Sequence, residues 1–378
     1  MRRTKPFFLF LLLFPSPLFA QQLPVPPPPS IAAKSYLLTD YYSKQIIVEQ
    51  NINQRIEPAS LTKLMTAYLT FAALKQKQIA LDQKLLVSTH AWHAEGSRMF
   101  IEPGKSVKVE DLIRGMVVES GNDACIALAE GIAGSEKTFA EMMNSEAQRL
   151  GMKNTHFANS TGLPDPQHYS TAYDLSLLAA AIINDFPEYY PLYSIKEYKY
   201  NNIMQYNRNR LLWTDPYVDG IKTGYTENAG YCLISSAKRG PRRLIAVTLD
   251  TASDSLRATE SQKLLNYGFL FYDTVHLYSK GQAVTSFTVW KGEENSVRAG
   301  FADDLYLSLP KGQSERLKAT MESQQPLTAP ITAGQKVGVV KITLDGKPLA
   351  EYPLIALDNV ELANILVRGW DSLRLLFN

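Results

Sequence analysis

Two residues in the first quarter of the chain have types and a spacing that could form a nucleophilic site. Ser60 and Lys63 are separated by two residues and closely follow Pro58. A helix places residues i and i+3 on one face, so the Lys63 amine could reach the Ser60 hydroxyl and take its proton. If Ser60 begins a helix, the helix N-terminus also offers backbone N–H groups to a developing oxyanion. The pattern therefore predicts an activated serine.

The Ser-x-x-Lys spacing alone is a weak signal, because a chain of this length contains about one or two such pairs by chance. Ser235 and Lys238 form a second pair, but they run from a predicted strand into a basic turn, where no helix aims the serine. Lys63 must also lose its proton near neutral pH. Its pKa, about 10.4 in a free lysine, would have to fall by about three units through burial and a neighbouring ammonium, for which Lys222 is the candidate.

Two further motifs could complete the site. Ser120-x-Asn122 lies within a predicted helical region, and Lys222, Thr223 and Gly224 end a predicted strand. The Ser120 hydroxyl could relay a proton, the Asn122 amide could hold a substrate amide, and Gly224 could let a substrate backbone approach the strand. Because side chains alternate along a strand, Lys222 and Thr223 could serve one site only from an open sheet edge. Each motif alone also fits an ordinary helix turn or strand end, but all three in order argue against coincidence.

Length and composition set the broad class of the protein. The chain has 378 residues, of which 45% are hydrophobic and 20% charged, which excludes a disordered, collagen-like or multi-span membrane protein. At about 150 residues per domain, this length predicts two or three domains. Lys and Arg number 39 against 37 Asp and Glu. This near balance gives no electrostatic footprint for nucleic acid, so no nucleic-acid partner is expected.

The N-terminal residues 1–20 have the pattern of a signal peptide: a basic start, an apolar run over 7–14 and a small residue at Ala20. The apolar run is too short to cross about 30 Å of hydrocarbon. Residues 21–30 are rich in proline and predict an extended spacer. The protein is therefore expected to be exported. Cys125 and Cys232 are the only cysteines, and we expect two unpaired, buried thiols.

Hydrophobic periodicity predicts the elements that would position these motifs. Helices are expected from Leu61 onward and over 109–131, 136–150, 172–184 and 255–272. Strands are expected over 35–39, 45–49, 217–223, 230–237 and 243–250. Because strands and helices come in blocks and not in βαβ alternation, residues 31–272 are predicted to form an α+β domain with an antiparallel sheet flanked by helices.

Beyond Asp273 the pattern changes. Short apolar runs recur about every ten residues and are split by Gly and Pro, which is typical of an all-β domain and is assigned to 273–360. Residues 361–378 return to a helical period with apolar residues on one side. Four charged residues interrupt any continuous apolar span, so this amphipathic helix is expected to lie in a membrane surface and not to cross it.

Taken together, the three motifs resemble the signatures of the serine penicillin-recognising acyl enzymes. The longer stretches 58–66, 119–125 and 218–224 are similar to low-molecular-mass penicillin-binding proteins that are D-alanyl-D-alanine carboxypeptidases. The resemblance covers nearly the whole mature chain, including the β-rich domain and the helical tail. It implies a β-lactamase/transpeptidase-like catalytic fold, a location at the periplasmic face of the bacterial inner membrane and no cofactor.

The resemblance also implies a reaction. Ser60 would be acylated by the penultimate D-alanine carbonyl of a peptidoglycan pentapeptide, the terminal D-alanine would leave, and water would hydrolyse the acyl-enzyme. β-Lactam antibiotics would acylate the same serine. Lys63 would be the base and Ser120 the relay to the leaving amine, while the backbone N–H groups of Ser60 and Tyr225 would form the oxyanion hole.

The remaining site residues come from the same resemblance. Lys222, Thr223 and Arg208 would receive the substrate carboxylate. Many relatives have His at the position of Tyr225, so a side-chain contribution to deacylation at this position is open.

Two other candidates have alternative interpretations. Asp174 matches an acidic family position near the floor of the site, but with Thr171 it also forms most of a helix capping box, so a supporting role and a capping role both stay open. His90 and His93 have helical spacing but no evident third ligand, so no metal site is predicted.

Three alternative functions remain for comparison. A serine β-lactamase shares the three motifs, but it would need an efficient deacylating base, typically a Glu, and no second β domain. A D,D-endopeptidase would use the same site as a minor activity. A non-catalytic wall-binding scaffold would lack at least one catalytic residue, and none is missing.

Overall fold

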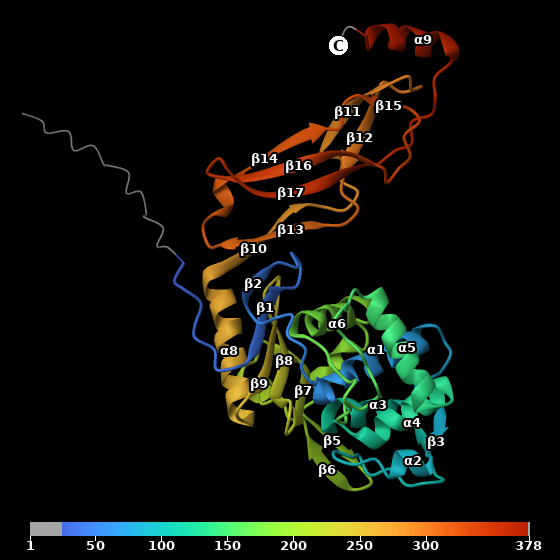
Figure 1. Cartoon of the computed structure of the whole chain (residues 1–378), viewed down its shortest axis with the longest axis vertical. Coiled ribbons are helices and arrows are strands. Elements are labelled where there is room, and N and C mark those ends of the chain that lie inside the picture. Colours follow the sequence, from blue (N-terminus) through green and yellow to red (C-terminus); the bar gives the residue numbers. More distant parts are fainter. Residues whose placement is uncertain (1–24, 377–378) are drawn as a thin grey trace, which may run out of the picture.

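The computed structural model describes residues 25–376. Residues 1–20, the predicted signal peptide, lie outside the described residues, and so do positions 21–24 of the predicted spacer and the last two residues of the chain. Two domains follow one another, with a short helix at the far end of the second domain (Figure 1).

A five-stranded antiparallel sheet forms the centre of the first domain, with the strand order β2-β1-β9-β8-β7. The strands are β1 (Ser35–Asp40), β2 (Ile46–Gln50), β7 (Val218–Thr226), β8 (Gly230–Arg239) and β9 (Arg242–Thr251). Strands β1 and β2, both predicted, pair as an antiparallel hairpin. Strand β7 lies at an edge, so one of its sides has no neighbouring strand in this sheet. This is the arrangement that allows both Lys222 and Thr223 to serve one site.

Helices cover both faces of this sheet. Helix α8 (Asp254–Phe271) packs against β8 and β9 on one face. Helix α6 (Ala172–Asp185) contacts β1 and β9 from the other face, where the remaining helices gather (Figure 1). Each face has its own buried apolar cluster, the larger one under the helical group. The predicted α+β class is confirmed.

The helical group contains longer helices, single turns and short hairpins. The helical segments are η1 (Ala59–Thr62), α1 (Lys63–Lys75), α2 (Thr89–Trp92), α3 (Val109–Arg114), η2 (Gly115–Glu119), α4 (Asn122–Ala133), α5 (Glu136–Arg149), η3 (Tyr190–Ser194) and α7 (Leu211–Thr214). Two hairpins complete the group and were not predicted: β3 (Lys84–Leu86) with β4 (Ser106–Lys108), and β5 (Glu197–Tyr200) with β6 (Ile203–Tyr206).

The prediction of a continuous helix over 109–131 is wrong, because the helix is interrupted at Ser120. Helix α3 continues into the π-helical turn η2, Ser120 adopts a left-handed conformation with φ of 65°, and α4 starts afresh at Asn122. Tertiary contacts hold this break. The backbone N–H of Asn122 donates to the Ser97 carbonyl at 2.7 Å, and the Asp123 carboxylate accepts from the N–H groups of Met99 and Phe100. The periodicity of residues 109–131 carries no signal for such contacts.

The second domain is built from strands, as predicted, around its own apolar cluster. Its strands are β10 (Tyr272–Tyr278), β11 (Thr285–Trp290), β12 (Ser296–Gly300), β13 (Leu305–Pro310), β14 (Leu317–Ser323), β15 (Leu327–Thr328), β16 (Lys336–Leu344) and β17 (Lys347–Ala356). Strands β10, β12 and β14 were not predicted. Strands β10 and β14 contain no fully buried residue, so they lack the apolar runs on which the prediction relied.

The two domains meet through the turn between β1 and β2. The Ser43 hydroxyl lies 2.8 Å from the Ser308 hydroxyl of β13, and Thr274 of β10 donates to the Asp40 carboxylate. The rings of Tyr42 and Tyr306 pack with their centroids 5.2 Å apart. The contact is therefore a small, mainly polar junction at the end of the sheet far from β7.

The C-terminal helix α9 (Ile365–Arg374) is shorter than the predicted 361–378. The helix begins after Asn364, whose side chain accepts from the Val367 N–H and caps the N-terminus. The residues before it bridge back to the β domain: Ala363 N–H donates to the Lys291 carbonyl. Among the described residues, no helix combines the length and apolar character needed to span a bilayer.

Candidate active site

The Ser60 hydroxyl and the Lys63 amine are in direct contact. Ser60 lies in the turn η1, and Lys63 is the first residue of α1, so one turn of helix brings the Lys63 Nζ to 2.8 Å from the Ser60 Oγ. The Lys63 side chain is 1% exposed. Its second hydrogen bond, 2.6 Å long, goes to the Thr161 carbonyl. Two acceptors therefore fix the direction of the amine, one of them the candidate nucleophile.

The Thr161 carbonyl belongs to a loop that the sequence did not implicate. Gly162 has φ of 86°, and a Cβ at this position would lie 1.8 Å from the Ala59 carbonyl oxygen. Only glycine allows the loop to approach the Ser60 turn this closely. A backbone carbonyl has no sequence signature, so only the tertiary structure could reveal its contact with Lys63.

The second and third motifs meet across the gap between the helical group and β7. The Lys222 Nζ donates to the Ser120 Oγ at 2.9 Å and to the Thr223 carbonyl at 3.0 Å. Both side chains are buried, with exposed fractions of 4% for Lys222 and 3% for Ser120. The left-handed backbone of Ser120 places its side chain at the turn before α4.

Asn122 is anchored through one end of its amide. Its Nδ2 donates to the Glu95 carbonyl at 2.6 Å. Its Oδ1 is buried and has no hydrogen-bond partner among the described residues. A buried acceptor without a donor is costly, so this oxygen is suited to accept an N–H from a bound substrate.

Gly224, which lines the cleft as a substrate-binding residue would, also has a packing role that was not predicted. A Cβ on Gly224 would lie 3.1 Å from the Pro58 carbonyl oxygen and 3.2 Å from the Leu61 Cγ. The glycine therefore lets β7 lie against η1, which brings the third motif next to Ser60. The Gly224 carbonyl accepts from Arg257 of α8 at 3.0 Å. Arg257, which the sequence analysis did not single out, holds this strand end in place.

These residues border one cleft of about 530 Å³. Residues of all three motifs line it, and so do Arg208, Arg257 and Tyr225. Arg208 is exposed and donates to the Ser97 hydroxyl at 2.8 Å. The Tyr225 side chain is half exposed and packs against Tyr231, with the ring centroids 4.3 Å apart. Ser60 thus lines the cleft together with Arg208 and Arg257, and the buried Lys63 contacts Ser60.

Burial changes the acidity of both lysines. The pKa of Lys63 is lowered to about 8, mainly by burial; the charge of Arg208 also lowers it, while Cys125 and Asp123 have the opposite effect. Burial also lowers the pKa of Lys222 well below the usual lysine range, with a further lowering by the charge of Lys63. The neighbouring cation that lowers the Lys63 pKa is thus Arg208 and not the predicted Lys222, and desolvation is the largest cause for both lysines.

Asp174 does not line this cleft. Its backbone N–H donates to the Thr171 hydroxyl, so Thr171 caps α6. Its carboxylate accepts from the Asn154 N–H at 2.8 Å and from the Thr155 hydroxyl at 2.7 Å. Asp174 therefore holds the start of the segment that leads to Thr161, and its side chain makes no return bond to the cap residue.

The other residues considered in the sequence lie apart from the cleft. His90 Nδ1 is 3.2 Å from a carboxylate oxygen of Glu130. Ser235 is buried within β8, and its hydroxyl has no partner among the described residues. Cys125 and Cys232 are buried and unpaired, and burial raises the pKa of both thiols to about 12.

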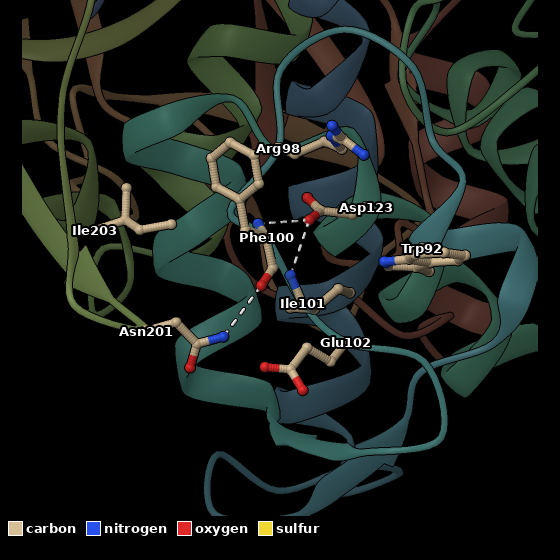
Figure 2. Close-up of a pocket in the computed structure, with 8 residues that line it drawn as sticks. All are labelled: Trp92, Arg98, Phe100, Ile101, Glu102, Asp123, Asn201 and Ile203. Atoms are coloured by element: carbon tan, nitrogen blue, oxygen red, sulfur yellow. Dashed lines mark hydrogen bonds between the residues drawn. The ribbon is translucent and has the colours of Figure 1, made fainter.

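A second pocket of about 340 Å³ is lined in part by Arg98, Phe100 and Ile101, which follow Ser97 in the chain (Figure 2). In this pocket the Asp123 carboxylate accepts from the N–H groups of Phe100 and Ile101. From the other side, Asn201 in the β5–β6 turn donates to the Phe100 carbonyl at 3.1 Å. The segment beside the cleft is thus held from two sides, by α4 and by the β5–β6 hairpin.

Two known families match this chain. The family described as D-alanyl-D-alanine carboxypeptidase matches residues 21–253. The family described as penicillin-binding protein 5, C-terminal domain, matches residues 272–362.

Individual relatives show the same similarity over nearly the full length. D-alanyl-D-alanine carboxypeptidase DacC of Escherichia coli is 41% identical over 98% of this chain and 94% of its own length. The crystal structure of penicillin-binding protein 5 from Haemophilus influenzae superposes with a TM-score of 0.86 at 41% identity, covering 89% of this chain and 99% of that one. Penicillin-binding protein D2 from Listeria monocytogenes, in an ampicillin-bound form, has a TM-score of 0.60 at 31% identity and covers 64% of this chain and all of that one.

Proposed function

We propose that this chain, which belongs to the D-alanyl-D-alanine carboxypeptidase family, removes the terminal D-alanine of a peptidoglycan pentapeptide through an acyl-enzyme on Ser60. The family resemblance read from the three motifs is confirmed by the comparisons. The serine mechanism and the role of each residue are the proposal, and the arrangement of the cleft supports them.

The first half of the reaction uses Lys63 as the base. Its free amine takes the proton of the Ser60 hydroxyl, 2.8 Å away, while the Ser60 oxygen attacks the carbonyl of the penultimate D-alanine. The oxyanion is received by the backbone N–H groups of Ser60 and Tyr225. Tyr225 lies on the edge strand β7, where alternate N–H groups point away from the sheet.

The second half releases D-alanine and then frees the serine. The C–N bond of the terminal D-alanine breaks as the proton that Lys63 took from Ser60 passes through the Ser120 hydroxyl to the leaving amine; the bond to Lys222 makes Ser120 part of a chain of exchangeable protons. Thr223, Lys222 and Arg208 receive the carboxylate of the leaving D-alanine, and the free Asn122 Oδ1 accepts a substrate amide N–H. Water then hydrolyses the acyl-Ser60 ester.

One observation carries the proposal: Lys63, buried without a carboxylate partner among the described residues and with a lowered pKa, donates to the hydroxyl of Ser60, which lines a cleft shared by residues of all three motifs. A non-catalytic scaffold does not need this arrangement, because burying an amine without a carboxylate partner costs free energy of folding. A groove for binding alone would therefore not retain it.

A serine β-lactamase is the nearest alternative. It would need a group that activates water for rapid deacylation, but the side chain of Asp174, the acidic candidate, is occupied by Asn154 and Thr155 and does not line the cleft. A minor D,D-endopeptidase activity would use the same cleft. The deciding experiment incubates the protein with a diacylated tripeptide ending in D-alanyl-D-alanine and measures free D-alanine. Release supports the proposal, whereas rapid penicillin turnover without release supports a β-lactamase.

We also propose that the protein is exported and lies at the periplasmic face of the inner membrane, attached by α9. The helix projects a row of exposed apolar side chains, among them Leu366, Trp370 and Leu373. Its opposite side is tied to the β domain, since the Asp371 carboxylate accepts from the Lys291 N–H at 2.7 Å. Such a helix would lie flat in the interface, with its apolar face in the lipid.

Deleting residues 361–378 should therefore move the protein from the membrane pellet to the soluble periplasmic fraction. The residues that line the catalytic cleft belong to the first domain, and α9 lies beyond the second domain (Figure 1), so labelling of the truncated chain by penicillin should stay within about two-fold of the full chain. The measurement is sedimentation followed by quantification of labelled protein. Unchanged sedimentation with the membranes would refute the anchor.

A further inference from the structure

Glu119 is a buried carboxyl group that the mechanism above does not use. It is the last residue of η2 and directly precedes Ser120. Glu119 is buried, with only 1% of the residue exposed. One carboxyl oxygen, Oε2, accepts from the Gln205 amide at 2.8 Å. The other, Oε1, is buried and has no hydrogen-bond partner among the described residues.

The Gln205 amide joins three segments that border the cleft. Its Nε2 donates one N–H to Glu119 and the other, at 2.9 Å, to the Arg98 carbonyl. Both N–H groups of the Gln205 amide are therefore used. Ser97 precedes Arg98, Ser120 follows Glu119, and Arg208 lies three residues after Gln205 in the chain. The hydrogen bonds of Gln205 to Glu119 and Arg98 therefore help to fix the position of Ser120 relative to Ser97 and Arg208.

The hydrogen bonds indicate which form of the carboxyl group fits this place. Gln205 donates to Oε2, so Oε2 is the acceptor and any proton is carried by Oε1. A neutral O–H without a partner costs far less than a buried charged oxygen without a donor. Burial and the negative charge of Asp123 together raise the pKa of Glu119 to about 8, against the lowering effect of Arg208.

Titratable and charged groups surround η2 on every element packed against it. Those that interact electrostatically with Glu119 are Asp123 of α4, Tyr198 of β5 and Arg208, which follows β6. The packed elements also carry Glu110, Asp111 and Arg114 of α3, Glu197, Lys199 and Tyr200 of β5, Tyr206 of β6, Tyr190 and Tyr193 of η3, and Lys63 of α1. Asp111 is engaged by the Tyr198 hydroxyl, and Arg114 by Glu110. Arg208 is thus the cation placed to respond to a charge on Glu119, and its present bond is to the exposed rim at Ser97.

We propose that Glu119 is a positioning residue that works as a neutral carboxylic acid: uncharged, it holds Ser120 in register with Ser97 and Arg208 through the Gln205 amide, and its ionisation disrupts the cleft. On ionisation the proton leaves to solvent and Oε1 becomes a buried charge that requires a donor. Arg208 is then drawn away from Ser97 toward Glu119, which removes a cation from the position of the substrate carboxylate. The inference rests on the proposed function, because it treats Ser120 and Arg208 as parts of that site.

The test compares Glu119→Gln with the wild-type chain. Glutamine keeps the shape and the acceptor for Gln205 but cannot ionise, so its acylation by a labelled penicillin at pH 7 should stay within about two-fold of wild type. With a pKa of about 8, about half of wild-type Glu119 is neutral at pH 8 and about 3% at pH 9.5. Because about half of the Lys63 amine is also free at pH 8, wild-type acylation should be highest near pH 8 and fall by roughly eight-fold by pH 9.5. The variant should lose less than about three-fold over the same range.

Glu197→Gln is the matched control, since Glu197 is an exposed carboxylate on the same hairpin. Its profile should follow wild type at every pH. Gln205→Ala should lower acylation about ten-fold already at pH 7, because it removes the amide that joins the three segments. Thermal unfolding midpoints, recorded for every variant, separate positioning from loss of the fold.

Three results would overturn the inference. A Glu119→Gln profile that overlays wild type at alkaline pH would mean that another group, such as Lys222, sets the alkaline decline. A folded Glu119→Gln that is more than about ten-fold slower at all pH values would mean that the negative charge is required. A wild-type chain that penicillin acylates at no pH would refute the proposed function, and with it this inference.

Discussion

Penicillin should add a single acyl group to the wild-type chain and none to Ser60→Ala. The Ser60 oxygen is the atom that would form the ester with the opened β-lactam. Among the described residues, Lys63 donates to the Ser60 hydroxyl and to the Thr161 carbonyl. The same substitution should lower D-alanine release by at least about 10⁴-fold, since removal of a nucleophile leaves only binding and oxyanion stabilisation. Intact-mass spectrometry measures the adduct, and peptide mapping should place it between Pro58 and Met65.

The adduct should persist on the time scale of the experiment. The amine released from an opened β-lactam ring stays tethered in the cleft and blocks water, and Asp174 is not placed to activate that water. Ser235→Ala is the control, because Ser235 belongs to the second Ser-x-x-Lys pair and its buried hydroxyl has no partner to lose. An adduct on Ser235, or one that survives Ser60→Ala, would show that the nucleophile is another residue.

Acylation should rise with pH up to about pH 8, where about half of the Lys63 amine is free. The neutral amine of Lys63 is the base, and with a pKa of about 8 about 9% of it is free at pH 7, against about 0.03% for a lysine of ordinary pKa. At pH 6 the free fraction is about 1%, so acylation should be about 100-fold slower than with the amine fully free. The measurement is the second-order rate constant of penicillin acylation from pH 5.5 to pH 8.

Lys63→Ala should slow acylation by about 10²- to 10⁴-fold and abolish this rise with pH, because Ser60 loses its base. Lys63→Arg should be equally slow, since a guanidinium keeps its proton at any of these pH values. Lys75→Arg on the exposed side of the same helix is the control and should behave as wild type. A Lys63→Ala chain that keeps the wild-type pH profile would assign the base to a different group.

The sequence predicted the identity of the three motifs, because each depends on residue types at short spacing. One helical turn alone sets the contact between Ser60 and Lys63, and it is present as predicted. The same holds for the division into a helix-flanked antiparallel sheet and a β domain, since block order and periodicity are local properties of the chain. The mostly buried strands β7, β8 and β9 were therefore predicted nearly in full, while the half-exposed β10 and β14 were missed.

Only the tertiary structure decided how the motifs meet. The break at Ser120 depends on contacts with Ser97 and Met99, which lie about twenty residues away. The acceptor that fixes Lys63 is a backbone carbonyl, and Gly224 is required by the approach of β7 to η1. The environment of Glu119 is likewise made by the unpredicted hairpin that carries Gln205. In each case the determining interaction is long-range or involves the backbone. Neither kind of interaction can be predicted from the types and spacing of neighbouring residues in the sequence.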